Sequence, residues 1–470
     1  MNRRLVLGAL ALASVLGALP AFAAAGVQLP RFVSSTLPNG AVVALVEKRD
    51  TPLLSLNVTV RGGALGDAPG RDGTASLFAD LIQKGAGARN AAQFAEAIEN
   101  VGGSLSAGAG SEALTIRASF LARDADLMLE LVADVLQRPR LEPAEFDQVR
   151  TLAVQSIAAA KDSDPRALLG SYGDAWLLRG HPYGRPVGGS ESTLAAIELG
   201  DVQRFYRDQV GGDRLIVTIV GDFEAAAMAQ KLEGKFGAWR KAALPLPAAP
   251  VPARATGRTV LLVDKPGATQ TYFWLGNVGA SRTDPARTAQ SVVNTVFGGR
   301  FTSMLNTELR IKSGLTYGAS AGFDRGSQPG AFSISSFTET SKTVEAIDMA
   351  LATLARLHQD GLSAEQLQSS RSYILGQFPP TLETNGQIAA RLADMLFHGL
   401  GPDDVNEYAT RVARVDAEAA RKAIEQSFPR PEDLAIVLIG DAEKIRDAVK
   451  KYGPVTEMKL TAPRFAPASR

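Results

Sequence analysis

Two unbroken apolar runs stand near the ends of the two halves of the chain. Leu215–Gly221 reads LIVTIVG and Leu434–Gly440 reads LAIVLIG, and an aspartate follows each run. Short continuous apolar runs are typical of strands covered on both faces. An amphipathic helical pattern follows each run and ends in an aromatic residue and a glycine, Phe236-Gly237 and Tyr452-Gly453, and glycine suits the end of a helix. Strand, turn and helix therefore recur in the same order.

The openings of the two halves match more loosely. Ala41–Glu47 and Thr259–Asp264 both have strand patterns. Several similar patterns that recur in the same order favour a duplication, so we expect two homologous α+β domains. Residues 241–257 are rich in Pro and Ala without hydrophobic periodicity, as in an extended linker. The predicted domains are residues 27–240 and 258–470.

The N-terminus has the pattern of an export signal. Arg3 and Arg4 precede an apolar run from Leu5 to Leu19, and Ala21-Phe22-Ala23 follows as a small-residue cleavage site. We expect residues 1–23 to be a signal peptide and the mature protein to be periplasmic, with no membrane association after cleavage. The alternative is an uncleaved membrane anchor.

The composition bounds the number of domains and excludes several kinds of functional site. The 470 residues suggest two to four domains. The 50 Lys and Arg against 49 Asp and Glu, without a long basic run, argue against a nucleic-acid partner. The chain has no cysteine, which excludes disulfides, thiolate nucleophiles and cysteine zinc sites.

A helix is predicted from Thr74 to Lys84, with Ser76 and Asp80 one turn apart on one face. Its frame, Gly73 to Gly85, resembles the zinc helix of the M16 (pitrilysin-like) peptidases, which reads G-x-A-His-x-x-Glu-His. Ser76 and Asp80 stand at the positions of the two zinc-binding histidines and Ala79 at that of the general base, so this zinc motif is degenerate. A hydroxyl is a poor zinc ligand, and alanine accepts no proton.

Other metal or hydrolase residues are missing as well. The family's third ligand is a glutamate on a later helix, but the corresponding stretch from Thr151 to Asp162 contains none, with Gln155-Ser156 nearest. The three histidines, His181, His358 and His398, stand singly without ligand spacing and are expected to be structural or on the surface. A serine hydrolase is not expected either, because a triad histidine would have to be one of these three isolated residues.

The second half keeps a different motif. A helix from about Thr302 to Lys312 should stop at Gly314, with a strand from Leu315 to Phe323. The stretch from Leu309 to Tyr317, LRIKSGLTY, is similar to the family's L-R-x-K-x-G-L-x-Y signature.

The resemblance implies that Arg310 and Tyr317 hold the substrate carbonyl and stabilise the oxyanion. It also implies that Gly298 and Gly299, in a glycine-rich loop, let a substrate backbone approach. The alternatives are that Arg310 is an ordinary cation at a helix end and that Tyr317, in phase with Leu315, is a core residue.

Together these resemblances imply a fold of two homologous domains, each a mainly antiparallel sheet packed with helices, as in the mitochondrial processing peptidase and pitrilysin. They imply a zinc-less subunit of a heterodimeric metallopeptidase that binds no cofactor itself, while a zinc-motif M16 subunit carries the metal for peptide hydrolysis. One alternative is a non-catalytic peptide-binding or assembly subunit. Another is a homodimer with unrelated chemistry, for which no convergent histidine, cysteine or paired-carboxylate group is expected.

Overall fold

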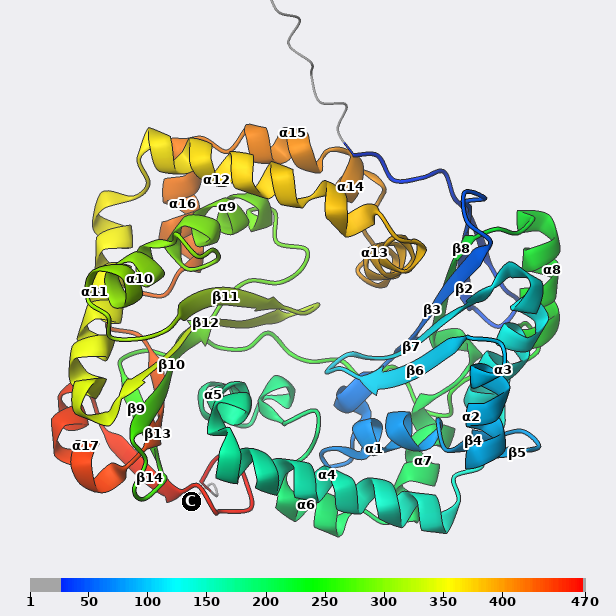
Figure 1. The fold of residues 1–470 in the computed structure, drawn as a ribbon, viewed down its shortest axis with the longest axis horizontal. Helices are drawn as coiled ribbons and strands as arrows, with labels where there is room; N and C mark the ends of the chain where they lie inside the picture. Colours follow the sequence, from blue (N-terminus) through cyan, green and yellow to red (C-terminus); the bar gives the residue numbers. More distant parts are fainter. Residues whose placement is uncertain (1–26, 468–470) are drawn as a thin grey trace, which may run out of the picture.

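The computed structural model describes residues 27–467 and contains two halves, each built on a six-stranded sheet (Figure 1). The predicted signal peptide, residues 1–23, lies outside the described residues. Among the residues described, no helix combines the length and the apolar character needed to cross a membrane.

The first sheet has the strand order β1-β2-β8-β3-β7-β6. Only the β2–β8 pair is parallel, and the other neighbours in this sheet are antiparallel. Every residue of β8 is buried, as its unbroken apolar run predicts. The strands are β1 (Val33–Thr36), β2 (Val42–Glu47), β3 (Leu53–Arg61), β6 (Ser104–Ala109), β7 (Ala113–Leu121) and β8 (Leu215–Gly221).

The second sheet repeats this order as β14-β9-β13-β10-β12-β11. The halves differ at one edge, where β14 runs parallel to β9 but β1 runs antiparallel to β2. The predicted α+β fold of two similar, mainly antiparallel sheets is confirmed. The strands are β9 (Thr259–Asp264), β10 (Gln270–Val278), β11 (Ala319–Arg325), β12 (Pro329–Glu339), β13 (Ala435–Gly440) and β14 (Val455–Lys459).

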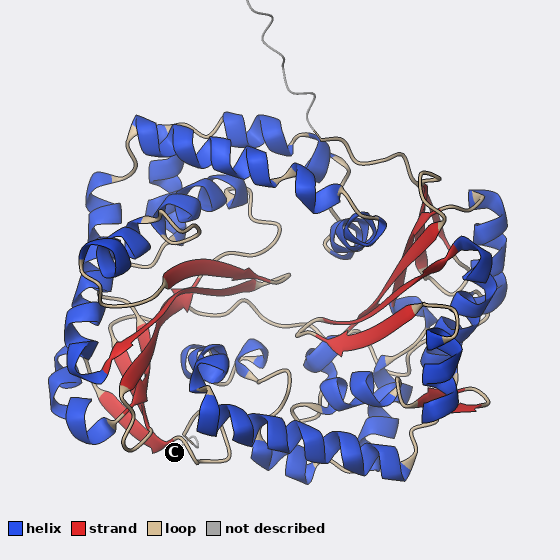
Figure 2. Ribbon diagram, viewed as in Figure 1, coloured by secondary structure: helices blue, strands red, loops and turns tan. Residues whose placement is uncertain are grey.

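Helices surround both sheets (Figure 2). In the first half they are α1 (Thr74–Leu81), α2 (Ala91–Glu99), α3 (Ala125–Gln137), α4 (Pro143–Ser163), α5 (Leu169–Leu177), α6 (Glu191–Ala196), α7 (Leu199–Gln209) and α8 (Ala225–Phe236), with a small hairpin of β4 (Gly85–Ala86) and β5 (Arg89–Asn90). In the second half they are α9 (Arg287–Phe297), α10 (Met304–Asn306), α11 (Thr343–Asp360), α12 (Ala364–Gln377), α13 (Asn385–Phe397), α14 (Asp403–Asn406), α15 (Tyr408–Ala413), α16 (Ala417–Ser427) and α17 (Ala442–Val449).

One helix from each half packs against the sheet of the other half. Helix α5 of the first half packs on β10 and β13, where Tyr172 and Trp176 join one apolar cluster with Trp274. Helix α13 of the second half packs on β3 and β8, where Leu392 is fully buried. The hydroxyl of Thr218 in β8 also donates to a backbone carbonyl of α13 at 2.8 Å. The halves therefore share cores through these two helices.

The segment 241–257 forms neither helix nor strand in the described chain. It is tied to both halves, because Arg214 donates to the carbonyl of Leu244 at 2.5 Å and the Ala255 amide donates to Asn277 at 2.9 Å. The domain limits 27–240 and 258–470 stay a prediction.

Candidate functional site

Helix α1 begins at a buried cap. The carboxylate of Asp67 accepts hydrogen bonds from the amides of Gly73 and Ala75, both at 2.8 Å. Gly73 has φ +102°, a conformation that glycine adopts without strain. Burial raises the pKa of Asp67 to about 7 even though these two amides favour its charged form.

The three positions of the degenerate zinc motif on α1 differ in exposure. Ser76 is partly exposed and Asp80 is exposed, whereas Ala79 is only 1% exposed. Partial burial of the carboxyl raises the pKa of Asp80, and the positive charge of Lys84 opposes this rise. Next to them, Gln83 donates to the carbonyls of Ala79 and of Ala107 in β6, at 2.9 and 3.2 Å. The buried Ala79 therefore presents no group to a substrate.

These residues do not fit a zinc ion. Among the described residues, no three His, Cys, Asp or Glu side chains are grouped so that they could hold a metal. The stretch that should carry a third ligand lies in α4, where Gln155 and Ser156 are exposed. A hydroxyl and one carboxylate give too few donors for a tetrahedral site.

The expected helix before Gly314 is present but irregular. Ser303 caps it, α10 follows, and Thr307–Lys312 forms a π-helical turn. Gly314 ends the helix at φ +66°, and the amide of Leu315 returns to the carbonyl of Leu309 at 2.8 Å. Wide turns of this kind are rare and occur often at functional sites.

Arg310 lies on this π-helical turn without a carboxylate partner among the described residues. Its guanidinium stands over the Phe301 ring, 4.7 Å from the ring centroid. The nearby Glu308 is occupied, because it binds Lys312 and Arg356 at 3.0 and 2.9 Å. The Arg310 guanidinium is therefore available to an added anionic group.

Tyr317 projects from a firmly held loop. Strand β11 begins at Ala319 and not at Leu315, so the expected strand starts four residues too early. Thr338 donates to the carbonyl of Leu315 at 2.7 Å, and Ser336 donates to that of Gly318 at 2.9 Å. Between these anchors the Tyr317 side chain is 80% exposed, so the alternative of a core tyrosine is wrong.

The two glycines before this helix have different surroundings. A Cβ on Gly298 would come within 2.6 Å of Ala321 in β11, whose amide donates to the Gly298 carbonyl at 3.1 Å. Internal packing therefore requires glycine at position 298. Gly299 is exposed, so its backbone is the more accessible of the two. Substrate binding by Gly298 and Gly299 stays a prediction.

The two sets of site residues lie in different halves. Ser76, Ala79 and Asp80 are on α1 in the first half, whereas Arg310 and Tyr317 lie between α10 and β11 in the second half. Figure 1 shows α1 and α10 on opposite sides of the molecule's centre. Within one chain, the structure does not bring the two sets together.

Two of the three histidines bind backbone carbonyls, and the third lies near a carboxylate. A ring nitrogen of His181 lies 2.9 Å from the carbonyl of Pro250, and one of His358 lies 3.0 Å from that of Pro429. His398 is largely buried, 3.6 Å from Asp394. Their expected structural roles agree with these contacts.

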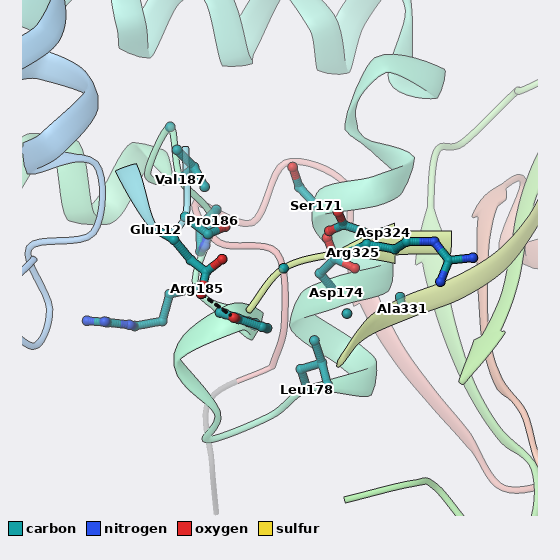
Figure 3. A pocket seen from close by; sticks show the side chains of 16 residues that line it. Glu112, Ser171, Asp174, Leu178, Arg185, Pro186, Val187, Asp324, Arg325 and Ala331 are labelled. Carbon is teal, nitrogen blue, oxygen red and sulfur yellow. Dashed lines mark hydrogen bonds between the residues drawn. The ribbon is translucent and has the colours of Figure 1, made fainter. Parts of the chain in front are cut away.

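A paired-carboxylate group that no sequence motif predicted lies where the halves meet (Figure 3). Asp174 from α5 and Asp324 from β11 line a cavity of about 370 Å³. Burial, followed by repulsion from Asp324, raises the pKa of Asp174 to about 7. Burial also raises the pKa of Asp324. The two aspartates stand far apart in the sequence with no shared motif, so only the fold reveals the pair.

A short hydrogen-bond chain links the halves beside this pair. The Tyr183 hydroxyl donates to Glu112 at 2.7 Å and accepts from the Gln328 amide at 3.1 Å. Glu112 also accepts from the Ser327 amide at 2.8 Å. Glu112 lies in the β6–β7 turn and Ser327 in the β11–β12 turn, so the tips of the two hairpins meet here. These hydrogen bonds join the two hairpin tips beside the paired carboxyls.

Comparison with known proteins gives the same family in both halves. Residues 42–191 match the model described as insulinase (peptidase family M16), and residues 196–373 match the one described as the peptidase M16 inactive domain. An uncharacterised zinc protease of Mycobacterium leprae is 28% identical over 76% of this chain and 80% of its own length. One of Streptomyces coelicolor is 24% identical over 88% and 92%.

A probable β subunit of the mitochondrial processing peptidase of Arabidopsis thaliana is 26% identical over 56% of this chain and 50% of its own length. Two solved structures have the same fold. A peptidase M16 inactive domain from Pseudomonas fluorescens has a TM-score of 0.81 at 21% identity, covering 87% of this chain and 98% of its own. A Helicobacter pylori protease has a TM-score of 0.80 at 19% identity, covering 87% and 100%. Because the two family models together match more than half of the sequence, the chain belongs to the M16 peptidase family.

Proposed function

We propose that this chain is the zinc-less subunit of a heterodimeric M16 peptidase and supplies Arg310 and Tyr317 to a zinc site on its partner. The observation that carries the proposal is that the first half lacks the family's zinc ligands, whereas the second half retains its arginine and tyrosine. Helix α1 keeps the family's frame without a metal ligand set among the described residues. The second half keeps a guanidinium, Arg310, that has no carboxylate partner in the part of the chain described, and an exposed phenol, Tyr317.

These two groups suit the stabilisation of an oxyanion. A guanidinium stays charged at any working pH, and a phenol can donate one short hydrogen bond. The Arg310 guanidinium has no carboxylate to compete for it in the described structure, and the exposed Tyr317 hydroxyl is not used internally. Such donors typically contribute on the order of 3 kcal/mol of transition-state stabilisation each.

Exposed apolar side chains around this pair support docking of a second molecule. Phe301 and Ile311 are 57% and 56% exposed; the Phe301 ring lies against the Arg310 guanidinium, and Ile311 follows Arg310 in the sequence. Large apolar side chains that gather on a surface favour an interface. The expected export to the periplasm remains part of the proposal and places the peptidase outside the cytoplasm.

The test is co-expression with a zinc-motif M16 relative, preferably one encoded beside it, followed by peptide hydrolysis assays. Arg310→Ala and Tyr317→Phe should each lower kcat/KM about 100-fold, because each removes one oxyanion donor. Arg446→Ala and Tyr272→Phe are the matched controls, since Arg446 forms a surface ion pair with Glu457 and the Tyr272 hydroxyl bonds to Gln270.

Full activity in both variants, with the complex intact by gel filtration, would instead favour the non-catalytic peptide-binding or assembly subunit. Chelator-sensitive hydrolysis by the purified chain alone would refute the proposal, because it would place the metal here.

A further inference from the structure

A second cavity, separate from the Arg310–Tyr317 segment, is unusually rich in arginine. It has a volume of about 350 Å³ and lies among α9, α12, α13 and the end of β11. Four arginines line it but only one carboxylate does: Arg282, Arg287, Arg325, Arg391 and Asp404. Its volume is at the lower end of the range of small-ligand pockets.

The internal ion pairs leave positive charge in excess. Arg282 binds Asp394 and Asp404, both at 2.7 Å, and Arg287 also binds Asp404. Burial disfavours a charged Asp404, but these two guanidiniums hold its pKa below the ordinary value. Arg391 comes only within 4.0 Å of Asp394, which Arg282 already uses. Three arginines therefore share two carboxylates, and Arg325 adds a fourth positive charge.

Arg325 has no carboxylate within ion-pair distance in the described residues. Its guanidinium lies 4.5 Å from the Phe323 ring centroid and donates to the side chain of Gln290, which is fully buried. Burial, then repulsion from Arg282 and Arg287, lowers the pKa of Arg325 to about 10, and Asp284 opposes this effect through space. At neutral pH the group is still a cation, and Figure 3 shows it pointing away from Asp174 and Asp324.

The rest of the cavity wall is apolar. Ile374, Phe378 and Tyr408 contribute to it, and the Phe378 and Tyr408 rings lie 4.5 Å apart. A free anion such as phosphate would not use this surface. A ligand with an apolar side chain directly beside its carboxylate would use both the surface and the guanidiniums, which bind carboxylates through paired hydrogen bonds.

We infer that this cavity binds a carboxylate that carries an adjacent apolar group, of the kind that the C-terminal residue of a peptide presents. That the carboxylate comes from a peptide rests on the proposed function, whereas carboxylate recognition itself does not.

The position of the cavity is consistent with an extended peptide. Helix α9 begins at Arg287 in the cavity and ends at Phe297, beside Gly299. Its eleven residues span about 16 Å, the length of about five extended residues. A peptide anchored here by its C-terminus would therefore reach Gly299.

The experiment measures calorimetric binding of three hexapeptides to the isolated chain, without the partner subunit. The first ends in leucine with a free carboxylate, the second is its C-terminal amide, and the third is an amide with an internal glutamate. The free acid should bind at least tenfold more tightly than either amide. Arg325→Gln and Arg391→Gln should each reduce its affinity at least tenfold, with Arg325→Lys in between, because lysine keeps the charge but not the paired donors. Arg123→Gln, at an exposed site, is the control.

Three outcomes would overturn the inference: equal affinity of acid and amide, no binding of the acid at millimolar concentration, or unchanged affinity in Arg325→Gln. Equal binding of the glutamate-containing amide would overturn the C-terminal assignment. A thermal melt identical to wild type shows that each variant is folded. Since no hydrolysis is measured, failure here is distinct from failure of the Arg310 and Tyr317 test.

Discussion

Replacing Asp174 with asparagine should stabilise the protein at alkaline pH and not at acid pH. The pKa of Asp174 rises from 3.8 to about 7 on folding, so the folded chain holds a proton that the unfolded chain releases. The stability that the protonated Asp174 contributes to the wild type is therefore lost as the pH rises from about 4 to 7. Above pH 7 this contribution is gone. Each pKa unit corresponds to about 1.4 kcal/mol, which sets an upper bound of about 4 kcal/mol.

Partial exposure of Asp174 lowers the expected gain to about 2 to 4 kcal/mol at pH 8.5. Within residues 27–467 the Asp174 side chain makes no hydrogen bond that the variant would lose, and asparagine has nearly the same shape. Asp67, whose pKa is raised to about 7 as well, contributes to the pH dependence of both proteins. The difference between variant and wild type therefore reports on Asp174 together with its repulsion from Asp324.

Urea unfolding followed by tryptophan fluorescence is a suitable assay, because Trp176 and Trp274 lie in the apolar cluster where α5 packs on the second sheet. Asp162→Asn, at an exposed position of α4, is the matched control and should show no such dependence on pH. A variant-minus-wild-type difference that stays constant between pH 4.5 and 8.5 would refute the proposed burial and repulsion at Asp174.

Three further predictions concern packing and metal. Gly173→Ala should destabilise the fold by about 1 to 3 kcal/mol in thermal unfolding, because its Cβ would lie 2.5 Å from the Trp274 ring; unchanged stability would contradict the close approach of α5 to β10. Leu392→Ala should cost about 3 to 5 kcal/mol in urea unfolding, since this α13 side chain is fully buried against the first sheet, and a cost below 1 kcal/mol would contradict that packing. Dialysis against EDTA should leave the melting temperature of the isolated chain unchanged, and a lower value would indicate a structural metal.

Periodicity and composition predicted the parts of the fold that depend on local sequence. The apolar run Leu215–Gly221 is a fully buried strand, and the helix from Thr74 and the stop at Gly314 are where the pattern placed them. The start of β11 was misplaced, because Leu315 and Tyr317 alternate like strand residues while side-chain bonds from β12 hold them in a loop.

Long-range features had no signal in the sequence. Nothing in α5 or α13 indicates that each covers the other half's sheet, because amphipathicity shows that a helix is covered and not what covers it. The pairing of Asp174 with Asp324 and the arginine cavity depend on this exchange and on the end of β11. Such sites arise from topology, and pattern analysis of one chain cannot assemble them.

The exchange of α5 and α13 also determines what happens when the backbone is cut. A protease that cleaves within 241–257 would remove the covalent link but leave each fragment holding a helix buried in the other. The nicked protein should migrate as a single species until it is denatured. For the same reason, a gene encoding only one half would produce a sheet with a bare apolar face, prone to aggregate unless the complementary fragment is made in the same cell.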